Sequence, residues 1–179
     1  MDSPRHIQNI ALIGFMGTGK SSVGRMLAEE LHFHFLDTDE LIVSRAGKSI
    51  AAIFAADGEA AFRKLERGVV EELATRKRTI VSTGGGLGAN AENLANLKTH
   101  ALTVCLWASP EKIWERVRGQ SHRPLLQDPN PLAKIRQLLA ERGPTYKQAD
   151  VLLNTELRSL REVTQQVLHQ FRLAKSPTP

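Results

Sequence analysis

Short apolar runs alternate along the chain with longer segments in which apolar residues recur every three or four positions. A short run between turn residues is typical of a buried strand, and the longer spacing is typical of an amphipathic helix. We interpret as strands Asn9–Phe15, Phe33–Asp37, Thr79–Thr83, Ala101–Trp107 and Asp150–Asn154. Helices are expected over 20–31, 39–45, 50–76 with a break near Asp57-Gly58, 92–98, 110–118, 132–148 with a break at Pro144, and from Ser159 onward.

This alternation predicts an α/β fold, in which five parallel strands form a sheet with helices on both faces. Two helix starts carry capping signals, namely Ser109 followed by Pro110, and the capping box from Ser159 to Glu162. The chain has 179 residues, which fits a single domain over 1–179. In such sheets ligands bind beyond the carboxyl ends of the strands, so the functional residues are expected at that edge.

The chain is basic, with 24 lysines and arginines against 19 acidic residues and a formal net charge of +5. These basic residues are spread along the sequence, and aromatic residues make up only 5% of it. The clustered basic patch of a nucleic-acid-binding protein is therefore not indicated. We expect small anionic partners, such as phosphates and carboxylates, and no nucleic acid.

The single cysteine, Cys105, lies in an apolar run, which predicts a buried thiol and excludes an internal disulfide. This usage is typical of a reducing compartment. The first nine residues lack the apolar core of a signal peptide, and no apolar run approaches the roughly 20 residues that span a bilayer. We expect a monomer in the cytoplasm with no membrane partner.

The stretch "GFMGTGKS", Gly14–Ser21, carries the strongest functional signal in the sequence. It matches the phosphate-binding pattern G-x-x-x-x-G-K-[ST], and it follows an expected strand and opens an expected helix, as that pattern requires. Backbone N–H groups of such a loop cradle phosphate oxygens, Lys20 can reach the β- and γ-phosphates of ATP, and the Ser21 hydroxyl can bind Mg²⁺. The remaining nucleotide contacts are expected from Gly17, Thr18, Gly19 and Ser22.

The stretch "FLDTDELI", Phe35–Ile42, places two carboxylates just after the second expected strand. One interpretation is a helix N-cap with acids in the first turn. The other is functional, because Asp37 ends a strand at the same edge as the phosphate loop. If the extended conformation persists to Asp39, both side chains point to one side. One carboxylate can then hold a water on Mg²⁺, and the other can accept a hydrogen bond from an attacking hydroxyl.

These residues together resemble shikimate kinase, a small member of the nucleoside-monophosphate-kinase-like group of P-loop proteins. The resemblance runs from about Ile10 to Phe171 and rests on the ordered motifs "GFMGTGKSSVG", "DTD", "GEAAFRKLE", "TGGG", "RPLL" and "ERGPTY". It implies transfer of the γ-phosphoryl group of ATP to the 3-hydroxyl of shikimate, with Mg²⁺, in aromatic amino-acid biosynthesis. It also implies three sub-regions, namely the phosphate loop and first helix over 9–32, a substrate-binding region over 37–66, and a mobile lid over 116–130.

By this resemblance, Asp37 is the outer-shell magnesium acid, and Asp39 is the carboxylate at the substrate hydroxyls and the candidate base. Arg63 and Arg142 are the contacts to the substrate carboxylate. A guanidinium fork fits a carboxylate well, and Glu66, three residues after Arg63 on a helix, can fix that fork. The alternative for Arg63 and Glu66 is a solvated surface ion pair.

The resemblance assigns further contacts. Gly84, Gly85 and Gly86 would let backbone N–H groups approach the substrate and the γ-phosphate. Phe54 and Phe62 would be apolar walls of the substrate pocket, with core packing as the competing interpretation. Arg123 would be the lid arginine that reaches the transferred phosphoryl group, and Arg116 would stack on adenine.

Two other functions stay open at this point. A kinase of another small acceptor, such as gluconate or a nucleoside monophosphate, is possible because paired arginines fit a phosphate as well as a carboxylate. A non-catalytic nucleotide-binding protein of the same fold is the third candidate. It is disfavoured because Lys20, Asp39 and Arg123 are all present.

Overall fold

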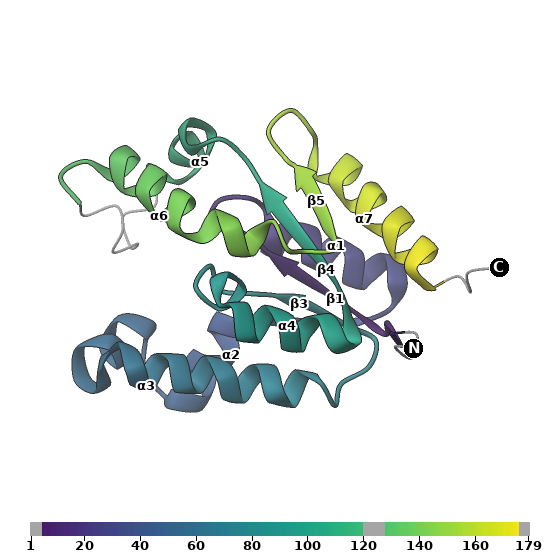
Figure 1. Cartoon of the computed structure of the whole chain (residues 1–179), viewed down its shortest axis with the longest axis horizontal. Coiled ribbons are helices and arrows are strands. Elements are labelled where there is room, and N and C mark those ends of the chain that lie inside the picture. Colours follow the sequence, from purple (N-terminus) through teal and green to yellow (C-terminus); the bar gives the residue numbers. More distant parts are fainter. Residues whose placement is uncertain (1–4, 120–127, 176–179) are drawn as a thin grey trace.

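A computed structural model describes residues 5–119 and 128–175 of the protein. Its five strands form one parallel sheet, as predicted, and their order in the sheet is β2-β3-β1-β4-β5 (Figure 1). The strands are β1 Asn9–Ile13, β2 His34–Asp37, β3 Thr79–Ser82, β4 Ala101–Trp107 and β5 Val151–Asn154.

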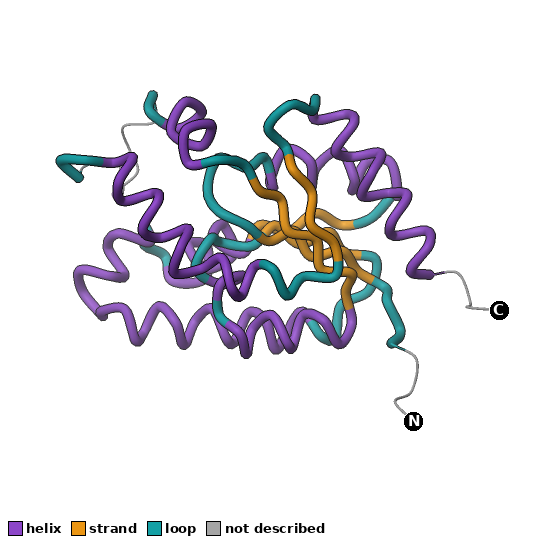
Figure 2. The backbone as a smooth tube through the Cα atoms, turned by 45° about the horizontal axis from the view of Figure 1, so that its top comes forward, coloured by secondary structure: helices purple, strands orange, loops and turns teal. Residues whose placement is uncertain are grey.

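Helices cover both faces of this sheet (Figures 1 and 2). Helices α1 and α7 pack together on one face, and α2, α3, α4 and α6 lie on the other, with α5 packed against α6. Their bounds are α1 Lys20–Leu31, α2 Thr38–Ala46, α3 Ile50–Leu73, α4 Ala91–His100, α5 Pro110–Val117, α6 Pro131–Tyr146 and α7 Leu160–Lys175, with a short 3₁₀ helix, η1, at Leu87–Ala89.

The core explains why the strands appear in the sequence as continuous apolar runs. In β1, Ile10 and Leu12 pack under α1 and α7, whereas Ala11 and Ile13 pack in the opposite layer. All four side chains are fully buried. A strand of a parallel sheet covered on both faces needs apolar residues at successive positions.

The predicted helix signals are mostly confirmed. Ser109 accepts a hydrogen bond from Lys112 N at the start of α5, and the Ser159–Glu162 capping box opens α7. Gly58 interrupts α3 with φ 78 and ψ 172, near the predicted break. The prediction that Pro144 breaks its helix is wrong, because α6 continues to Tyr146. A proline this close to a helix end removes only one late backbone hydrogen bond, which a well-packed helix tolerates.

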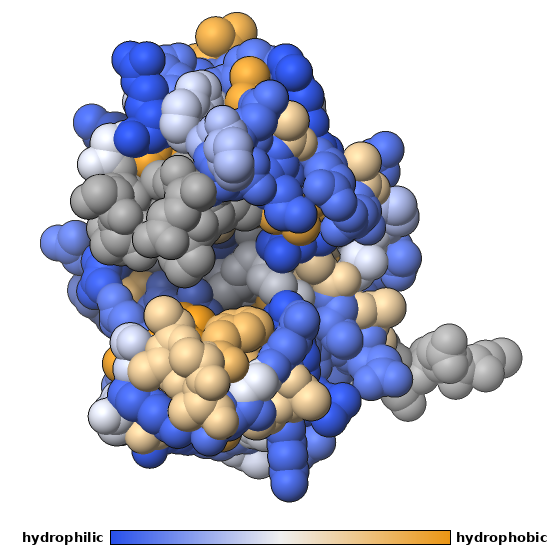
Figure 3. Space-filling view, turned by 90° about the vertical axis from the view of Figure 1, so that its left-hand side faces the viewer, coloured by the Kyte–Doolittle hydropathy of each residue, from blue (hydrophilic) through white to orange (hydrophobic). Residues whose placement is uncertain are grey.

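The loops that carry the predicted functional residues follow the carboxyl ends of the strands and lie at the same edge of the sheet. The loop after β1 leads into α1, β2 ends at Asp37, and β3 is followed by Gly84–Gly86. Figure 3 shows that the molecule is hollowed at one end, below α6 and above an apolar surface over the first part of α3. Among the described helices, none is both long and apolar enough to span a bilayer.

Candidate active site

The loop between β1 and α1 has the backbone that phosphate binding requires. Gly14, Gly17 and Gly19 have φ values of 131°, 74° and 93°, which only glycine adopts without strain. At Gly14 a Cβ would also overlap the Leu106 carbonyl oxygen. The Lys20 ammonium is held over the loop, where it donates a hydrogen bond to the Phe15 carbonyl at 2.7 Å. Lys20 is 8% exposed, so its charge lies in a poorly hydrated position beside the loop.

Asp37 satisfies both interpretations of the acidic stretch, with one oxygen for each. Its Oδ1 caps α2 by accepting from the backbone N–H groups of Asp39 and Glu40, at 3.0 and 3.4 Å. Its Oδ2 accepts from the Ser21 hydroxyl at 3.0 Å, and that hydroxyl lies 3.2 Å from Ser82 Oγ. The condition of an extended chain through Asp39 is not met, because α2 begins at Thr38, one residue before the predicted helix start.

One cavity of about 290 Å³ nevertheless brings both acids to the phosphate loop. The first turn of a helix, rather than strand alternation, turns Asp39 toward it. The sequence interpretation missed three lining residues, Met16, Ser82 and Thr83. The full lining is Met16, Gly17, Gly19, Lys20, Ser21, Ser22, Asp37, Asp39, Ser82, Thr83, Gly84 and Gly85.

The three glycines after β3 leave room for charged side chains that approach the loop closely. The Gly84 N–H donates to Thr38 Oγ1 at 2.9 Å, and its approach to the substrate stays a prediction. A Cβ at Gly84 would overlap the Asp39 carboxylate, and one at Gly86 would overlap the Arg63 guanidinium. A Cβ at Gly85 would lie 3.4 Å from Arg142 Nη1. Three charged side chains from three different elements thus converge on this loop.

Arg63 is held by two carboxylates of very different burial. Its Nη1 donates to Glu66 Oε2 at 2.7 Å, and the Glu66 side chain is only 2% exposed. Its Nε and Nη2 both donate to Glu59 Oε1, an interaction that the sequence interpretation missed. Partial burial by itself would lower the pKa of Arg63, but its interactions with Glu66 and Glu59 have the larger effect. The pKa of Arg63 is therefore raised, and the guanidinium stays charged. The buried Glu66 excludes the interpretation of a fully solvated surface pair.

The pKa of the Glu66 carboxyl depends on its burial and on the charges that surround it. Burial raises its pKa, the Arg63 guanidinium opposes that shift, the Asp39 charge adds to it, and the Arg142 charge opposes it. Arg142 itself lies over the Phe15 ring, 5.5 Å from its centroid. The Glu66 carboxyl therefore lies close enough to Asp39, Arg63 and Arg142 for each of these charges to act on it.

Tyr146 supports the glycine loop and was not predicted. Its hydroxyl donates to the Gly85 carbonyl at 2.7 Å, and burial raises its pKa to about 12, with Arg142 opposing the shift. Tyr146 follows Arg142 by four residues, so both project from the same face of α6. That spacing within "ERGPTY" was the available signal.

Phe54 and Phe62 pack against each other, with ring centroids 4.8 Å apart. Phe62 belongs to the buried core, which supports the competing interpretation for that residue, although its ring also lies 5.6 Å from Arg63 Cζ. Phe54 is exposed on the apolar surface of α3. Their role as pocket walls stays a prediction.

A second cavity, of about 250 Å³, lies on the other side of the phosphate loop. Arg116 lines it and ties the loop to the end of β5, donating to Gly17 O at 3.2 Å and to Thr155 Oγ1 and O at 3.0 and 2.6 Å. Arg158 is also at this cavity. Arg116 is thus hydrogen-bonded to the phosphate loop, and its stacking on adenine stays a prediction.

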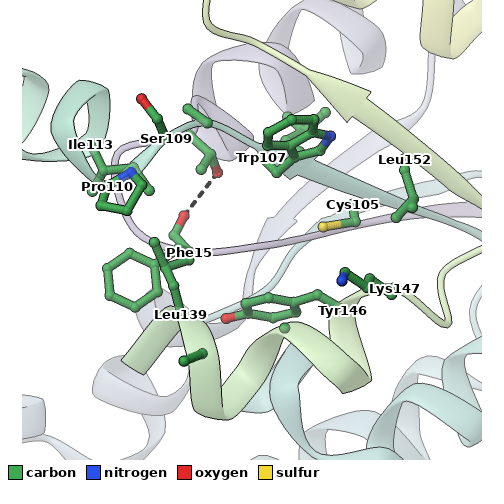
Figure 4. A pocket seen from close by; sticks show the side chains of 15 residues that line it. Phe15, Cys105, Trp107, Ser109, Pro110, Ile113, Leu139, Tyr146, Lys147 and Leu152 are labelled. Atoms are coloured by element: carbon green, nitrogen blue, oxygen red, sulfur yellow. Dashed lines mark hydrogen bonds between the residues drawn. The ribbon is translucent and has the colours of Figure 1, made fainter. Parts of the chain in front are cut away.

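A third cavity, of about 770 Å³, is lined mainly by the end of β4 and by α5 and α6 (Figure 4). Most of its lining is apolar, from Phe15, Trp107, Leu139 and Leu152 among others. Cys105 also lines it, and burial raises the pKa of its thiol to about 11, so the thiolate is scarce near neutral pH. A cavity of this character suits neither phosphates nor a phosphoryl transfer.

Arg123, the predicted lid arginine, lies outside the described residues, as does the middle of the predicted lid.

A glycine-rich loop that opens α1 at the carboxyl edge of a parallel sheet, with two acids beside it, defines a P-loop α/β nucleotide-binding fold with the side chains of a phosphotransferase. The chain belongs to the shikimate kinase family, whose model matches residues 16–172. Members of this family are ATP-dependent kinases that phosphorylate shikimate.

Individual relatives agree with this family. A shikimate kinase of Thermodesulfovibrio yellowstonii is 40% identical over 173 residues, covering 96% of this chain and all of that one. A structure described as shikimate kinase from Acinetobacter baumannii in complex with shikimate superposes with a TM-score of 0.88 at 38% identity, covering 97% of each chain. A gluconokinase of Sinorhizobium meliloti, at 20% identity and a TM-score of 0.64, shares the fold alone.

Proposed function

We propose that this enzyme transfers the γ-phosphoryl group of ATP to the 3-hydroxyl of shikimate in aromatic amino-acid biosynthesis. The observation that carries the proposal is the convergence of Asp39, Arg63 and Arg142 on the Gly84–Gly86 loop, beside the phosphate loop. An acceptor bound there would present a carboxylate to the arginines and hydroxyls to the aspartate. That pairing matches a hydroxylated carboxylic acid better than a nucleotide.

The nucleotide is proposed to lie across the phosphate loop. The base would lie in the cavity of Arg116 and Arg158, and the γ-phosphate would lie in the cavity of Lys20. Backbone N–H groups of residues 17–22 and the start of α1 favour negative charge there. The Lys20 ammonium would stabilise the charge that spreads over the transferred phosphoryl oxygens.

The proposed Mg²⁺ site comprises Ser21 and Asp37. Their oxygens lie 3.0 Å apart, and a hydroxyl with one carboxylate is the sparse, hard donor set that Mg²⁺ uses when phosphates and waters complete its coordination. No group of three or more His, Cys, Asp or Glu that could hold a metal occurs among the described residues. The ion would neutralise phosphate charge and orient the γ-phosphate.

Asp39 is proposed to contact the acceptor hydroxyl and to take its proton as the new P–O bond forms. It lines the same cavity as Lys20, so the hydroxyl it holds faces the γ-phosphate. In a loose transition state, positioning of the nucleophile accounts for much of the rate. Asp39 therefore serves either as the base or as the group that orients the hydroxyl.

Several further roles remain proposals. Arg123 would reach the transferred phosphoryl group from a lid over 116–130, and Phe54 and Phe62 would bound the acceptor. We also propose that 1–179 acts as one domain with 9–32 and 37–66 as its nucleotide and acceptor regions. The enzyme would act as a monomer in the cytoplasm, without a nucleic-acid or membrane partner.

A coupled assay of ATP consumption tests the proposal. Shikimate, quinate, gluconate and the nucleoside monophosphates are compared as acceptors, each with Mg²⁺ and with excess chelator. We expect shikimate to give the highest kcat/KM and the chelator to abolish turnover. Faster phosphorylation of a nucleoside monophosphate or of gluconate than of shikimate would overturn it.

A further inference from the structure

The carboxylate of Glu59 occupies one complete edge of the Arg63 guanidinium. Its Oε1 accepts from Nη2 at 2.8 Å and from Nε at 3.2 Å. A guanidinium binds a carboxylate strongly through two parallel N–H groups, and the Nε–Nη2 pair is one such fork. Glu59 therefore already uses donors that a carboxylate ligand of Arg63 would need.

Two carboxylates contact Arg63, and their burial gives them different roles. Glu66 is 2% exposed, so the loss of its ion pair with Arg63 would leave a buried charge poorly compensated. Glu59 is 66% exposed, and exposed ion pairs contribute little because water competes for both charges. Glu66 thus fixes the guanidinium, whereas Glu59 can leave it at small cost.

Glu59 lies at the start of the helical segment that carries Arg63. It follows Gly58, whose φ of 78° and ψ of 172° interrupt the helix. The Arg63 guanidinium at its other side lies against Gly86, in the group of charges that contains Asp39 and Arg142. A ligand carboxylate that reaches Arg63 from this group meets the negative charge of Glu59.

We propose that Glu59 is an internal competitor for the acceptor carboxylate, and that it weakens the binding of acceptors that carry one. This inference rests on the proposed function, because it concerns the same acceptor site. An acceptor with a carboxylate replaces Glu59 on the Nε–Nη2 edge of Arg63, and Glu59 turns out into water. A neutral acceptor has no charge that could replace the Glu59 carboxylate on Arg63, so the Glu59–Arg63 pair stays in place.

The test measures equilibrium binding of two ligands, shikimate and its neutral methyl ester, by titration calorimetry at one fixed salt concentration. Glu59→Gln keeps the shape of the side chain and removes its charge, and Glu59→Ala removes the side-chain acceptor entirely. Glu71→Gln is the matched control, because Glu71 is an exposed glutamate on the same helix. Unfolding midpoints of all variants show whether the fold is kept.

We expect both Glu59 variants to bind shikimate about two- to fivefold more tightly than the wild type, which is the range that an exposed ion pair allows. Affinity for the methyl ester should stay within about twofold, and Glu71→Gln should match the wild type for both ligands. Unchanged or weaker shikimate binding in the Glu59 variants would overturn the inference, because Glu59 would then position Arg63 instead of competing for it. Wild-type protein that neither binds nor phosphorylates shikimate would overturn the proposed function itself.

Discussion

The Asp39 carboxylate lies directly against Gly84. A Cβ on residue 84 would overlap Asp39 Oδ1 and would lie 3.0 Å from the carboxyl carbon. The two residues are also linked through Thr38, whose hydroxyl accepts a hydrogen bond from the Gly84 N–H at 2.9 Å. Gly84 has no left-handed backbone conformation. It is therefore required for the room that it leaves to Asp39.

Gly84→Ala should displace the Asp39 carboxylate and lower kcat by about 10- to 100-fold, because a shift on the order of 1 Å in a positioned group has an effect of that size. The fold should be retained, since a short side chain can rotate away from the added methyl group. Steady-state kinetics and an unfolding curve measure the two effects separately. Gly68→Ala is the control, because a Cβ at Gly68 on α3 meets nothing within 4 Å. Wild-type kcat in Gly84→Ala would show that Asp39 needs no such room.

Asp39→Asn keeps the size of the side chain and removes its charge and basicity. We expect kcat to fall by about 10²–10⁴-fold, the range for a positioned general base, while ATP binding and the unfolding midpoint stay near the wild-type values. Pre-steady-state measurement of the first turnover shows whether the chemical step is the one affected. If kcat stays within a few-fold of the wild type, Asp39 serves only as an acid in the first turn of α2.

The strands and most helix starts could be predicted because their signals are local. The capping box of Ser159 and Glu162, and the glycines of the phosphate loop, act within a few residues of chain. The break at Pro144 was predicted wrongly because tertiary packing of α6 outweighs a local preference. The start of α2 was predicted to within one residue, but the role of Asp37 stayed open because this residue both caps the helix and accepts a hydrogen bond from Ser21.

The site was predictable residue by residue only in part. The phosphate loop and the two aspartates could be recognised because each is a short motif of neighbouring residues. Arg63 and Arg142 were identified only through the resemblance to the family. The contact of Gly84 with Asp39 joins elements that are far apart in the sequence, and no local pattern reports it. Tyr146 and Glu59 have ordinary helical spacing from the arginines, which by itself is typical of any exposed helix face.

Arg63→Ala should weaken shikimate binding by about tenfold or more, because hydrogen bonds to charged groups contribute roughly 1.5–3 kcal/mol each. Arg63→Lys should restore only part of this affinity, since an ammonium cannot offer a two-pronged fork. ATP affinity should be nearly unchanged in both variants, because Arg63 does not line either nucleotide cavity. Titration of each ligand measures these effects. Equal losses for ATP and shikimate would indicate a folding defect caused by the unpaired, buried Glu66.

Asp150 provides a test of stability away from the active site, at the opposite edge of the sheet. Its carboxylate accepts hydrogen bonds from both outer nitrogens of Arg5 at 2.9 Å and from the backbone and hydroxyl of Thr103 at 2.8 and 2.7 Å. Burial alone would raise the pKa of Asp150, but these interactions dominate and lower it from 3.8 to about 2. The side chain is 18% exposed, so solvent screens the interaction only in part.

The lowered pKa gives the dependence of stability on pH a definite sign. Above about pH 4, Asp150 is ionised in both the folded and the unfolded chain, and the favourable interactions of the charged form contribute fully. Between about pH 4 and pH 2 the unfolded chain binds the proton first, so this contribution falls away as the pH is lowered. The difference of pKa corresponds to about 2 kcal/mol at neutral pH.

Asp150→Asn should therefore lower the free energy of unfolding by about 2 kcal/mol at pH 7, and the deficit relative to the wild type should shrink as the pH falls from 4 toward 2. Urea unfolding curves of the two proteins, measured at a series of pH values, give this difference directly. Asp57→Asn is the control, because Asp57 pairs with Lys48 at the exposed surface and should contribute below about 1 kcal/mol. A deficit for Asp150→Asn that stays constant down to pH 2 would mean that Asp150 stabilises the sheet edge by its shape and neutral hydrogen bonds, and not by its charge.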